Sequence, residues 1–126
     1  MLFRQLFDKT SSTYTYVIAS AIGREAVIID PVLDNVKLYI QLLKELDLKL
    51  VKVIDTHIHA DHITAASKLK NETNCTTIMG EHTPSNTVEI KVKNDEIIYV
   101  DDLKIRAIYT PGHTKDSYSF IMNDYL

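Results

Sequence analysis

The chain has 126 residues, of which 14 are Lys or Arg, 17 are Asp or Glu, and 45% are hydrophobic. This length suits a single domain or part of one, and such a mixture of apolar and charged residues is typical of a folded chain rather than a disordered one. The formal net charge of -3 argues against a dedicated nucleic-acid binder, which normally carries a basic surface. We therefore expect no nucleic-acid partner.

The N-terminal segment and the cysteine content predict a cytoplasmic protein. Residues 1–7 include Arg4 and Gln5 and lack the apolar block of an export signal. No window of the sequence approaches the apolar length of a membrane span, so we expect no membrane partner. The single cysteine, Cys75, has no second thiol with which to form an internal disulfide, and this favours a reducing compartment.

The first half of the sequence predicts an antiparallel meander followed by a strand–helix–strand unit. Strands are expected where Thr, Tyr, Val and Ile concentrate, and the apolar run before Pro31 fits a strand buried on both faces. Apolar residues three and four apart predict an amphipathic helix of about three turns, capped near Asp34. Such a crossover favours parallel pairing of its two flanking strands. We expect strands at 2–8, 12–20, 25–30 and 48–55, and a helix at 36–46.

The second half predicts one more helix and several further strands. Asn94-Asp95 and Asp101-Asp102 are typical of turns, and Pro111-Gly112 interrupts the chain. The helix is expected at 62–71, and the strands at 75–79, 87–91, 96–100, 103–110 and 117–122. The sequence contains no recognisable repeat or linker, so residues 1–126 are expected to belong to one domain.

The segment from Thr56 to His62 reads T-H-x-H-x-D-H and predicts a metal site. Residues two apart at a strand end point to the same side, so His57 and His59 can converge on one point. Asp61 and His62 follow where the chain bends into the next helix. Imidazoles together with a carboxylate suit Zn or Fe(II). Taken singly, the two histidines also fit surface or packing residues, and Asp61 also fits a helix N-cap.

A fourth candidate histidine, His113, follows a later strand, in Thr110-Pro111-Gly112-His113-Thr114. Pro111 fixes one backbone dihedral and Gly112 permits geometry that other residues avoid, so this turn can aim His113 across a cleft. The conjunction of the two segments indicates a common metal. Outside it, we interpret His82 as a surface residue and Cys75 as a buried small hydrophobe rather than a nucleophile.

These motifs resemble the metallo-β-lactamase superfamily, whose pattern is T-H-x-H-x-D-H with a later P-G-H-T. Within it, the sequence looks most like the persulfide dioxygenases, also called sulfur dioxygenases. The stretches that carry this likeness are RQLFD at 4–8, SSTYTY at 11–16, REAVIIDP at 24–31, HIHADHIT at 57–64 and TPGHT at 110–114. The resemblance implies an α/β (α+β) fold, the αββα sandwich, of which residues 1–126 would be the N-terminal, first sheet-and-helix half.

The resemblance also implies an iron enzyme that oxidises glutathione persulfide to sulfite with O2. His57 and His113 match the two iron-binding histidines of the family, and His59, Asp61 and His62 match the rest of the motif. We expect one Fe(II) per chain, with Zn as the alternative. The predicted metal ligands are His57, His113 and His59, and the predicted catalytic set is His57, His59, Asp61, His62 and His113.

The sequence departs from the family pattern in two respects. The carboxylate iron ligand of the family lies in a T-G-D segment after the strand that follows P-G-H-T, and the sequence as written reaches Leu126 before any such segment. A later histidine and the basic residues that bind glutathione belong to the same missing part. Residue 65 is alanine where the subgroup usually has glycine. We therefore expect the N-terminal half of a persulfide dioxygenase.

Two other functions stay open. A thioester hydrolase of the hydroxyacylglutathione type would use a zinc-bound hydroxide. Those relatives usually carry a bulkier residue before the motif aspartate and Gly-Gly after it, where this sequence has Ala60 and Ala65-Ala66. The other function is that of a non-catalytic metal-binding module. Half a sandwich leaves a hydrophobic sheet face uncovered, so we expect the chain to form homo-oligomers or to aggregate.

Overall fold

The protein is described by a computed structural model that covers residues 1–56, 65–83, 88–112 and 117–122. Within these ranges the chain forms two sheets, with strand orders β1-β2-β3-β4-β5-β6 and β7-β8-β9. The strands are β1 Leu2–Asp8, β2 Thr13–Ala19, β3 Glu25–Ile29, β4 Lys49–Ile54, β5 Thr76–Gly80, β6 Ile90–Val92, β7 Ile97–Val100, β8 Leu103–Tyr109 and β9 Tyr118–Met122. The helices are the 3-10 turn η1 Leu33–Asn35, α1 Val36–Glu45 and α2 Ala65–Thr73.

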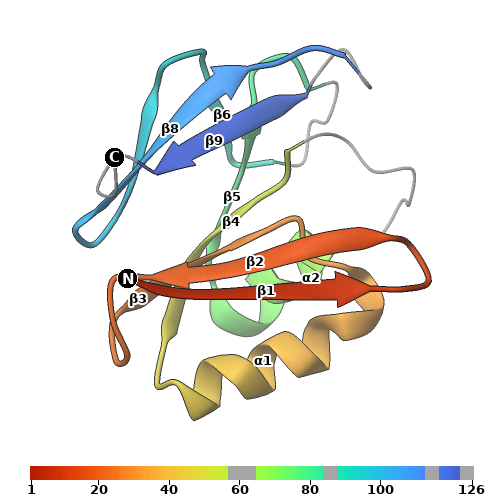
Figure 1. The fold of residues 1–126 in the computed structure, drawn as a ribbon, viewed down its shortest axis with the longest axis vertical. Coiled ribbons are helices and arrows are strands. Elements are labelled where there is room, and N and C mark those ends of the chain that lie inside the picture. The colour runs from red at the N-terminus through yellow and green to blue at the C-terminus, as the bar shows by residue number, and fades with distance from the viewer. Residues whose placement is uncertain (57–64, 84–87, 113–116, 123–126) are drawn as a thin grey trace.

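The elements stack in the layer order helix, sheet, sheet. Figure 1 shows α1 beneath the β1–β2 hairpin, with β8 and β9 above it. Both described α-helices contribute to one buried cluster with the six-stranded sheet, and the three-stranded sheet packs on the other face in a second cluster. This is a partial form of the expected αββα sandwich, and it includes strands of both sheets.

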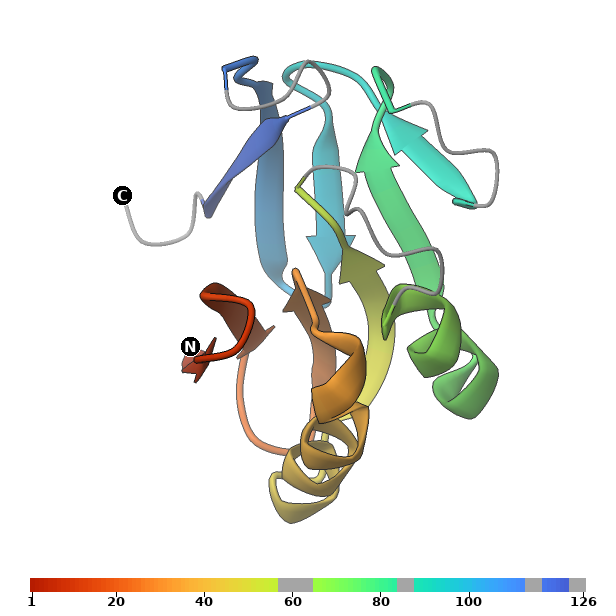
Figure 2. The ribbon, with the colours of Figure 1, turned by 90° about the vertical axis from the view of Figure 1, so that its right-hand side faces the viewer.

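The predicted pairing of the first half is confirmed. β1, β2 and β3 form an antiparallel meander, and β3 pairs in parallel with β4 across the α1 crossover. β4, β5 and β6 continue in parallel, and Figure 2 shows β4 and β5 side by side with their arrowheads toward the same edge. The carboxyl ends of these parallel strands therefore lie along one edge of the sheet.

Several predicted boundaries are corrected by the structure. Asp34 does not cap α1: it lies inside η1, and the N-cap Asn35 makes no side-chain capping bond. The backbone satisfies this helix end instead, because the Asn35 N–H donates to the Val32 carbonyl at 3.0 Å. α2 ends at Thr73 rather than near Asn71, and its predicted start at His62 lies outside the described residues. β6 is confined to Ile90–Val92 because only those residues pair with β5.

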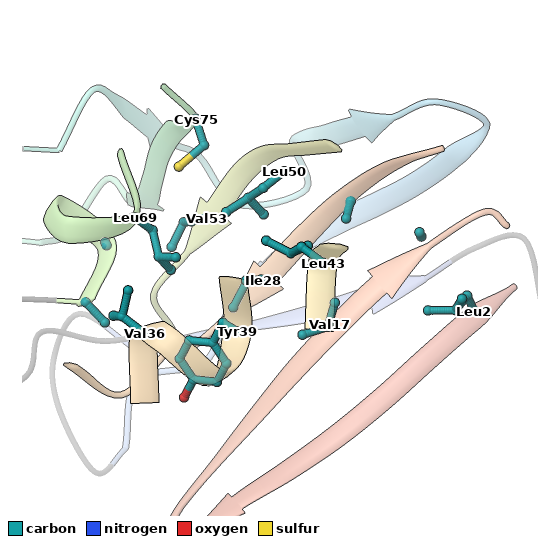
Figure 3. Packing of buried hydrophobic residues seen from close by; sticks show 14 residues of the cluster. Leu2, Val17, Ile28, Val36, Tyr39, Leu43, Leu50, Val53, Leu69 and Cys75 are labelled. Carbon is teal, nitrogen blue, oxygen red and sulfur yellow. The ribbon is translucent and has the colours of Figure 1, made fainter. Parts of the chain in front are cut away.

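The alternation of side chains along β3 explains why the six-stranded sheet is buried on both faces. Ala26 and Ile28 face the helices, whereas Val27 and Ile29 face the second sheet. On the helix side, Figure 3 shows Tyr39 and Leu43 of α1 packed among sheet residues such as Ile28. Ala65, at which the family usually has glycine, is buried in this same cluster, so the methyl group is accommodated.

The second sheet is tied to the first by polar contacts at the end remote from the predicted metal site. The guanidinium of Arg24 lies 3.4 Å from Asp101 and 3.6 Å from Asp102, both in the β7–β8 turn. The N–H of Glu25, the first residue of β3, also donates to the Asp101 carboxylate at 2.7 Å. Asp101 has a φ of 50°, a left-handed conformation that aspartate tolerates in turns. The turn predicted at Asp101-Asp102 is thus also an anchor between sheets.

Within the described residues, neither helix has the length and apolar character that crossing a membrane would require.

Gly80 is required by a close contact between the two sheets. It ends β5, and the buried ring of Tyr118 from β9 lies directly against its backbone. A methyl group at position 80 would overlap Cδ1 and Cε1 of that ring and would lie 2.8 Å from Cγ. Because the ring is enclosed, it has no free space into which it can move.

We expect Gly80→Ala to lower the free energy of unfolding by about 1–3 kcal/mol, as overpacking of a filled core does. Urea denaturation measures the change. Gly112→Ala is the matched control, because no heavy atom lies within 4 Å of a Cβ built there. Equal losses of stability in the two variants would contradict this account of Gly80.

Candidate metal centre

The residues predicted to form the site lie outside the described part of the chain. His57, His59, Asp61 and His62 fall in 57–64, and His113 falls in 113–116, so their arrangement stays a prediction. Among the residues that the structure does describe, no group of three or more His, Cys, Asp or Glu side chains could hold a metal ion. What the structure does describe is the chain on either side of each predicted segment.

One backbone hydrogen bond joins the residue before the first histidine segment to the strand that follows the second one. The N–H of Tyr118 donates to the Thr56 carbonyl at 2.8 Å. Thr56 directly precedes His57, and Tyr118 begins the strand that follows the His113 turn. The N–H of Thr110 also donates to the Ser117 carbonyl at 3.0 Å, so the described residues on either side of the His113 segment are bound to each other. The described residues that border the two histidine segments, more than fifty positions apart in sequence, are therefore joined by backbone hydrogen bonds.

The carboxylate of Asp30 holds Thr56 from the side of the first sheet. It accepts hydrogen bonds from the Thr56 N–H at 2.8 Å and from the Thr56 hydroxyl at 2.7 Å. The Asp30 N–H donates to the carbonyl of Ile54, the last residue of β4, at 2.8 Å. Asp30 has a φ of 54°, a left-handed conformation that is uncommon for residues other than glycine. Bonds on both its backbone and its side chain hold it in that conformation.

The helix core supports Asp30 through two buried hydroxyl groups. The Thr15 hydroxyl donates to the Asp30 carbonyl at 2.7 Å and lies 3.1 Å from the Tyr39 hydroxyl. Since the single hydroxyl proton of Thr15 goes to Asp30, Tyr39 is the donor to Thr15. The Tyr39 oxygen also accepts the Val32 N–H at 2.9 Å. These bonds run from the core of α1 to the residue before His57.

Aromatic side chains lie at the strand ends that border the His113 segment. The His82 imidazole stacks on the Tyr109 ring, with centroids 4.0 Å apart and planes 20° apart. The Tyr109 ring in turn lies 5.3 Å from that of Tyr118. His82 is exposed, which confirms its prediction as a surface residue, but it also contacts the last residue of β8. The sequence carried no signal of this contact, because it joins separate elements.

Burial shifts the pKa of two weakly acidic groups, one at the start of β9 and one directly before β5. It raises the pKa of the Tyr118 phenol, so that group stays neutral at neutral pH. Burial likewise raises the pKa of the Cys75 thiol. Cys75 is only 1% exposed and packs in the helix-side cluster, which confirms the interpretation of a small buried hydrophobe.

An open cavity of about 350 Å³ lies between the sheets beside Thr56. Its lining is chiefly apolar and comes from β1, β2, β3 and β9, with Phe3, Tyr16, Phe120 and Met122 among the contributors. Asp30 and Thr56 also border it. The cavity therefore lies next to Thr56, the residue before the first histidine segment, and is bordered by strands of both sheets.

The sequence analysis quoted Asp30 and Thr56 within its motifs but assigned neither of them a role next to the predicted site. The sequence does contain a signal for Asp30. It is a polar residue at the end of an apolar strand, and ligand-binding sites of parallel sheets lie at the carboxyl ends of their strands. Tyr118 offered no such signal. Its importance comes from a backbone bond to Thr56 and from its fit against Gly80, and neither is visible in the order of residues.

Comparison with known proteins identifies the family. The model of the metallo-beta-lactamase superfamily matches residues 9–125, and the chain therefore belongs to this superfamily. This confirms the resemblance inferred from the motifs.

Curated relatives include the human "Persulfide dioxygenase ETHE1, mitochondrial", which is 33% identical over 126 residues. The match covers 99% of this chain and 49% of the human protein. A "Probable hydroxyacylglutathione hydrolase" of Schizosaccharomyces pombe is 34% identical over 113 residues, which cover 88% of this chain and 44% of that protein. The chain thus spans about half the length of the curated relatives that it matches.

Solved structures agree with this grouping. ETHE1 from Myxococcus xanthus has a TM-score of 0.91 and 44% sequence identity, over 98% of this chain and 55% of that one. A metallo-beta-lactamase from Staphylococcus aureus has a TM-score of 0.86 and 31% identity, over 98% of this chain and 39% of that one. The chain is therefore similar to proteins with different named activities that share one frame.

The role of the Thr56 hydroxyl can be tested by a matched pair of substitutions. Thr56→Val keeps the size of the side chain but removes the donor to Asp30, and we expect it to lower the free energy of unfolding by about 1–3 kcal/mol. Thr56→Ser keeps the donor and should lose less than half as much. Denaturant unfolding of both variants measures this difference. Equal losses would show that the hydrogen bond from the Thr56 hydroxyl to Asp30 does not stabilise the fold.

Proposed function

We propose that this chain is the N-terminal half of one metallo-β-lactamase-type domain, and that the whole domain is an iron-dependent persulfide dioxygenase. The reaction is oxidation of glutathione persulfide to sulfite with O2. The observation that carries this proposal is similarity along nearly the whole chain to proteins named ETHE1, at 44% identity and a TM-score of 0.91 for the bacterial one. The likeness to the mammalian persulfide dioxygenases supports it.

The proposed ligands are His57, His59 and His113, with Asp61 and His62 beside them. The donor set fits a metal, since imidazole and carboxylate suit Fe(II) or Zn. The Thr56–Tyr118 bond supports convergence, because it joins the residue before the first histidine segment to the first residue of the strand that follows the second one, at 2.8 Å. The further carboxylate that the family pattern implies belongs to the part of the relatives that this chain does not span.

The chain's own residues prepare the site in two ways. Asp30 holds the residue before His57 through two hydrogen bonds, which limits the directions in which the first segment can leave β4. The lining of the open cavity beside Thr56 is chiefly apolar, so it offers an apolar surface next to the first histidine segment. A bound Fe(II) would supply open positions for O2 and for the persulfide sulfur, and would favour the deprotonated sulfur.

A hydroxyacylglutathione-type hydrolase that uses Zn is the second candidate. Its support is the 34% identity to the Schizosaccharomyces pombe protein named as a probable hydrolase of that kind. Ala60 and Ala65-Ala66 stand against it, because the hydrolases usually carry other residues there. A non-catalytic metal-binding module is the third candidate.

Metal analysis and oxygen uptake separate these candidates in the full-length protein. We expect one iron per chain and O2 consumption with glutathione persulfide. His57→Ala and His113→Ala should each lose most of the iron and lower the rate by about 100-fold or more. Two zinc ions with thioester hydrolysis would support the hydrolase. A loaded iron centre without O2 uptake would contradict the dioxygenase.

We also propose that the 126-residue chain alone forms homo-oligomers. The edge strand β1 and its neighbour β2 carry aromatic pairs, Phe3 with half-buried Tyr16 at 5.5 Å and Phe7 with exposed Tyr14 at 4.8 Å between ring centroids. Phe3 and Phe7 are 44% and 49% exposed. Within the described residues β9 has a strand neighbour on one side only, so its other edge can pair with a further strand.

Sedimentation velocity tests this association. We expect species larger than the monomer, and the double substitution Phe3→Ser and Phe7→Ser should shift the distribution toward the monomer. Ile22→Ser is the control, because Ile22 is 66% exposed but lies outside the strands, in the β2–β3 connection. A monodisperse wild-type monomer that unfolds cooperatively would exclude the proposal.

The cytoplasm is the proposed compartment. Its support is the content of a single cysteine, Cys75, which is buried. The mammalian relatives are named as mitochondrial, so fractionation of the native host decides between the compartments.

A further inference from the structure

The stacking of His82 on Tyr109 connects the residues after β5 to the end of β8, which precedes the second histidine segment. The ring planes are 20° apart at a centroid separation of 4.0 Å, and His82 also lies 6.2 Å from the Tyr118 ring. Tyr109 precedes Thr110-Pro111-Gly112, and Tyr118 follows Ser117. The imidazole therefore contacts residues that flank both sides of the segment carrying His113.

The backbone around His82 is held on both sides. The N–H of Glu81 donates to the Val92 carbonyl at 2.7 Å, and the N–H of Thr83 donates to the Gly80 carbonyl at 3.2 Å. The hydroxyl of buried Thr83 donates to the sulfur of Met79 at 3.6 Å. Because these hydrogen bonds fix the backbone on both sides of His82, its exposed side chain can restrain the position of Tyr109.

Tyr109 and the residue after it are also held by hydrogen bonds to the segment before β7 and to residues of, or next to, β9. Its N–H donates to the Asn94 side-chain oxygen at 2.7 Å. The next residue, Thr110, is bound to Ser117 through its N–H at 3.0 Å and to the Ser119 hydroxyl at 2.9 Å. A displacement of Tyr109 would therefore be passed to the base of the turn.

We propose that His82 is a positioning residue for the turn that carries His113. It acts through the flat contact of its ring with Tyr109, and so through the Thr110–Ser117 and Tyr118–Thr56 bonds, rather than by touching substrate. This role rests on the proposed function, because it concerns the metal that His113 is proposed to bind. The ring face is the feature required, so another planar ring should replace the imidazole.

Amide hydrogen exchange in the full-length protein tests the contact without using activity. We expect His82→Ala to speed exchange at the Thr110 and Tyr118 amides about threefold to tenfold, the effect of losing one aromatic pair. Exchange in the core strand β3 should not change. His82→Phe should restore the wild-type rates. Tyr99→Ala is the control, since Tyr99 is an exposed aromatic residue of β7, in the same sheet as β8 and β9.

Anaerobic titration with Fe(II) alone tests the consequence for the metal. His82→Ala should weaken Fe(II) binding by about the same threefold to tenfold factor, and His82→Phe should restore it. The KM for glutathione persulfide should stay at the wild-type value while kcat falls with iron occupancy.

Two results would overturn the proposal. One is wild-type exchange and iron affinity in His82→Ala. The other is rescue by His82→Gln but not by His82→Phe, because the ring nitrogens and not the ring face would then matter. Absence of O2 uptake by the iron-loaded wild type would refute the proposed dioxygenase alone, since the exchange rates and iron affinities are measured independently of turnover.

Discussion

Thr56 joins the two sheets through its backbone N–H and carbonyl groups and through its hydroxyl group. The N–H and hydroxyl of Thr56 donate to the Asp30 carboxylate, and its carbonyl accepts the Tyr118 N–H from the second sheet. Bonds to a carboxylate are stronger than bonds between neutral groups. The residue that precedes His57 is therefore held in place by both sheets, and the proposed chemistry depends on this constraint.

The sandwich is fixed at two opposite ends by different interactions. At the end remote from the site, Asp101 of the β7–β8 turn binds Arg24 and the backbone of β3. At the site end, Tyr118 binds Thr56 and rests on Gly80. Between these anchors the apolar side chains of the two sheets interdigitate. Because contacts hold the two sheets together at both ends, they oppose sliding of one sheet over the other.

The fold by itself does not determine which reaction a member of the family catalyses. Proteins named as persulfide dioxygenase, hydroxyacylglutathione hydrolase and metallo-beta-lactamase all resemble this chain over most of its length. Folds are reused for different reactions, and the reaction is set by the residues on the loops. Here the predicted metal-binding segments follow β4 and β8, and a side chain outside the metal motif, His82, contacts the last residue of β8.

Local patterns predicted most of the secondary structure. Apolar periods and turn residues located the strands and helices to within a few residues, since burial imposes repeats of two on strands and 3.6 on helices. The cap at Asp34 was wrong because a backbone bond within a 3-10 turn can satisfy a helix end without any side-chain signature. Short β6 was overextended because its length depends on pairing with β5.

The sequence by itself determined the elements, the family and the identity of the proposed metal-binding residues, because strand and helix repeats and the spacing of histidines are properties of neighbouring positions. Only the tertiary structure decided that Asp30 holds Thr56, that Tyr118 joins the second sheet to the first, and that His82 lies against Tyr109. Each of these contacts links residues more than twenty positions apart. Such contacts arise from how whole elements pack, and packing depends on all the surrounding side chains at once.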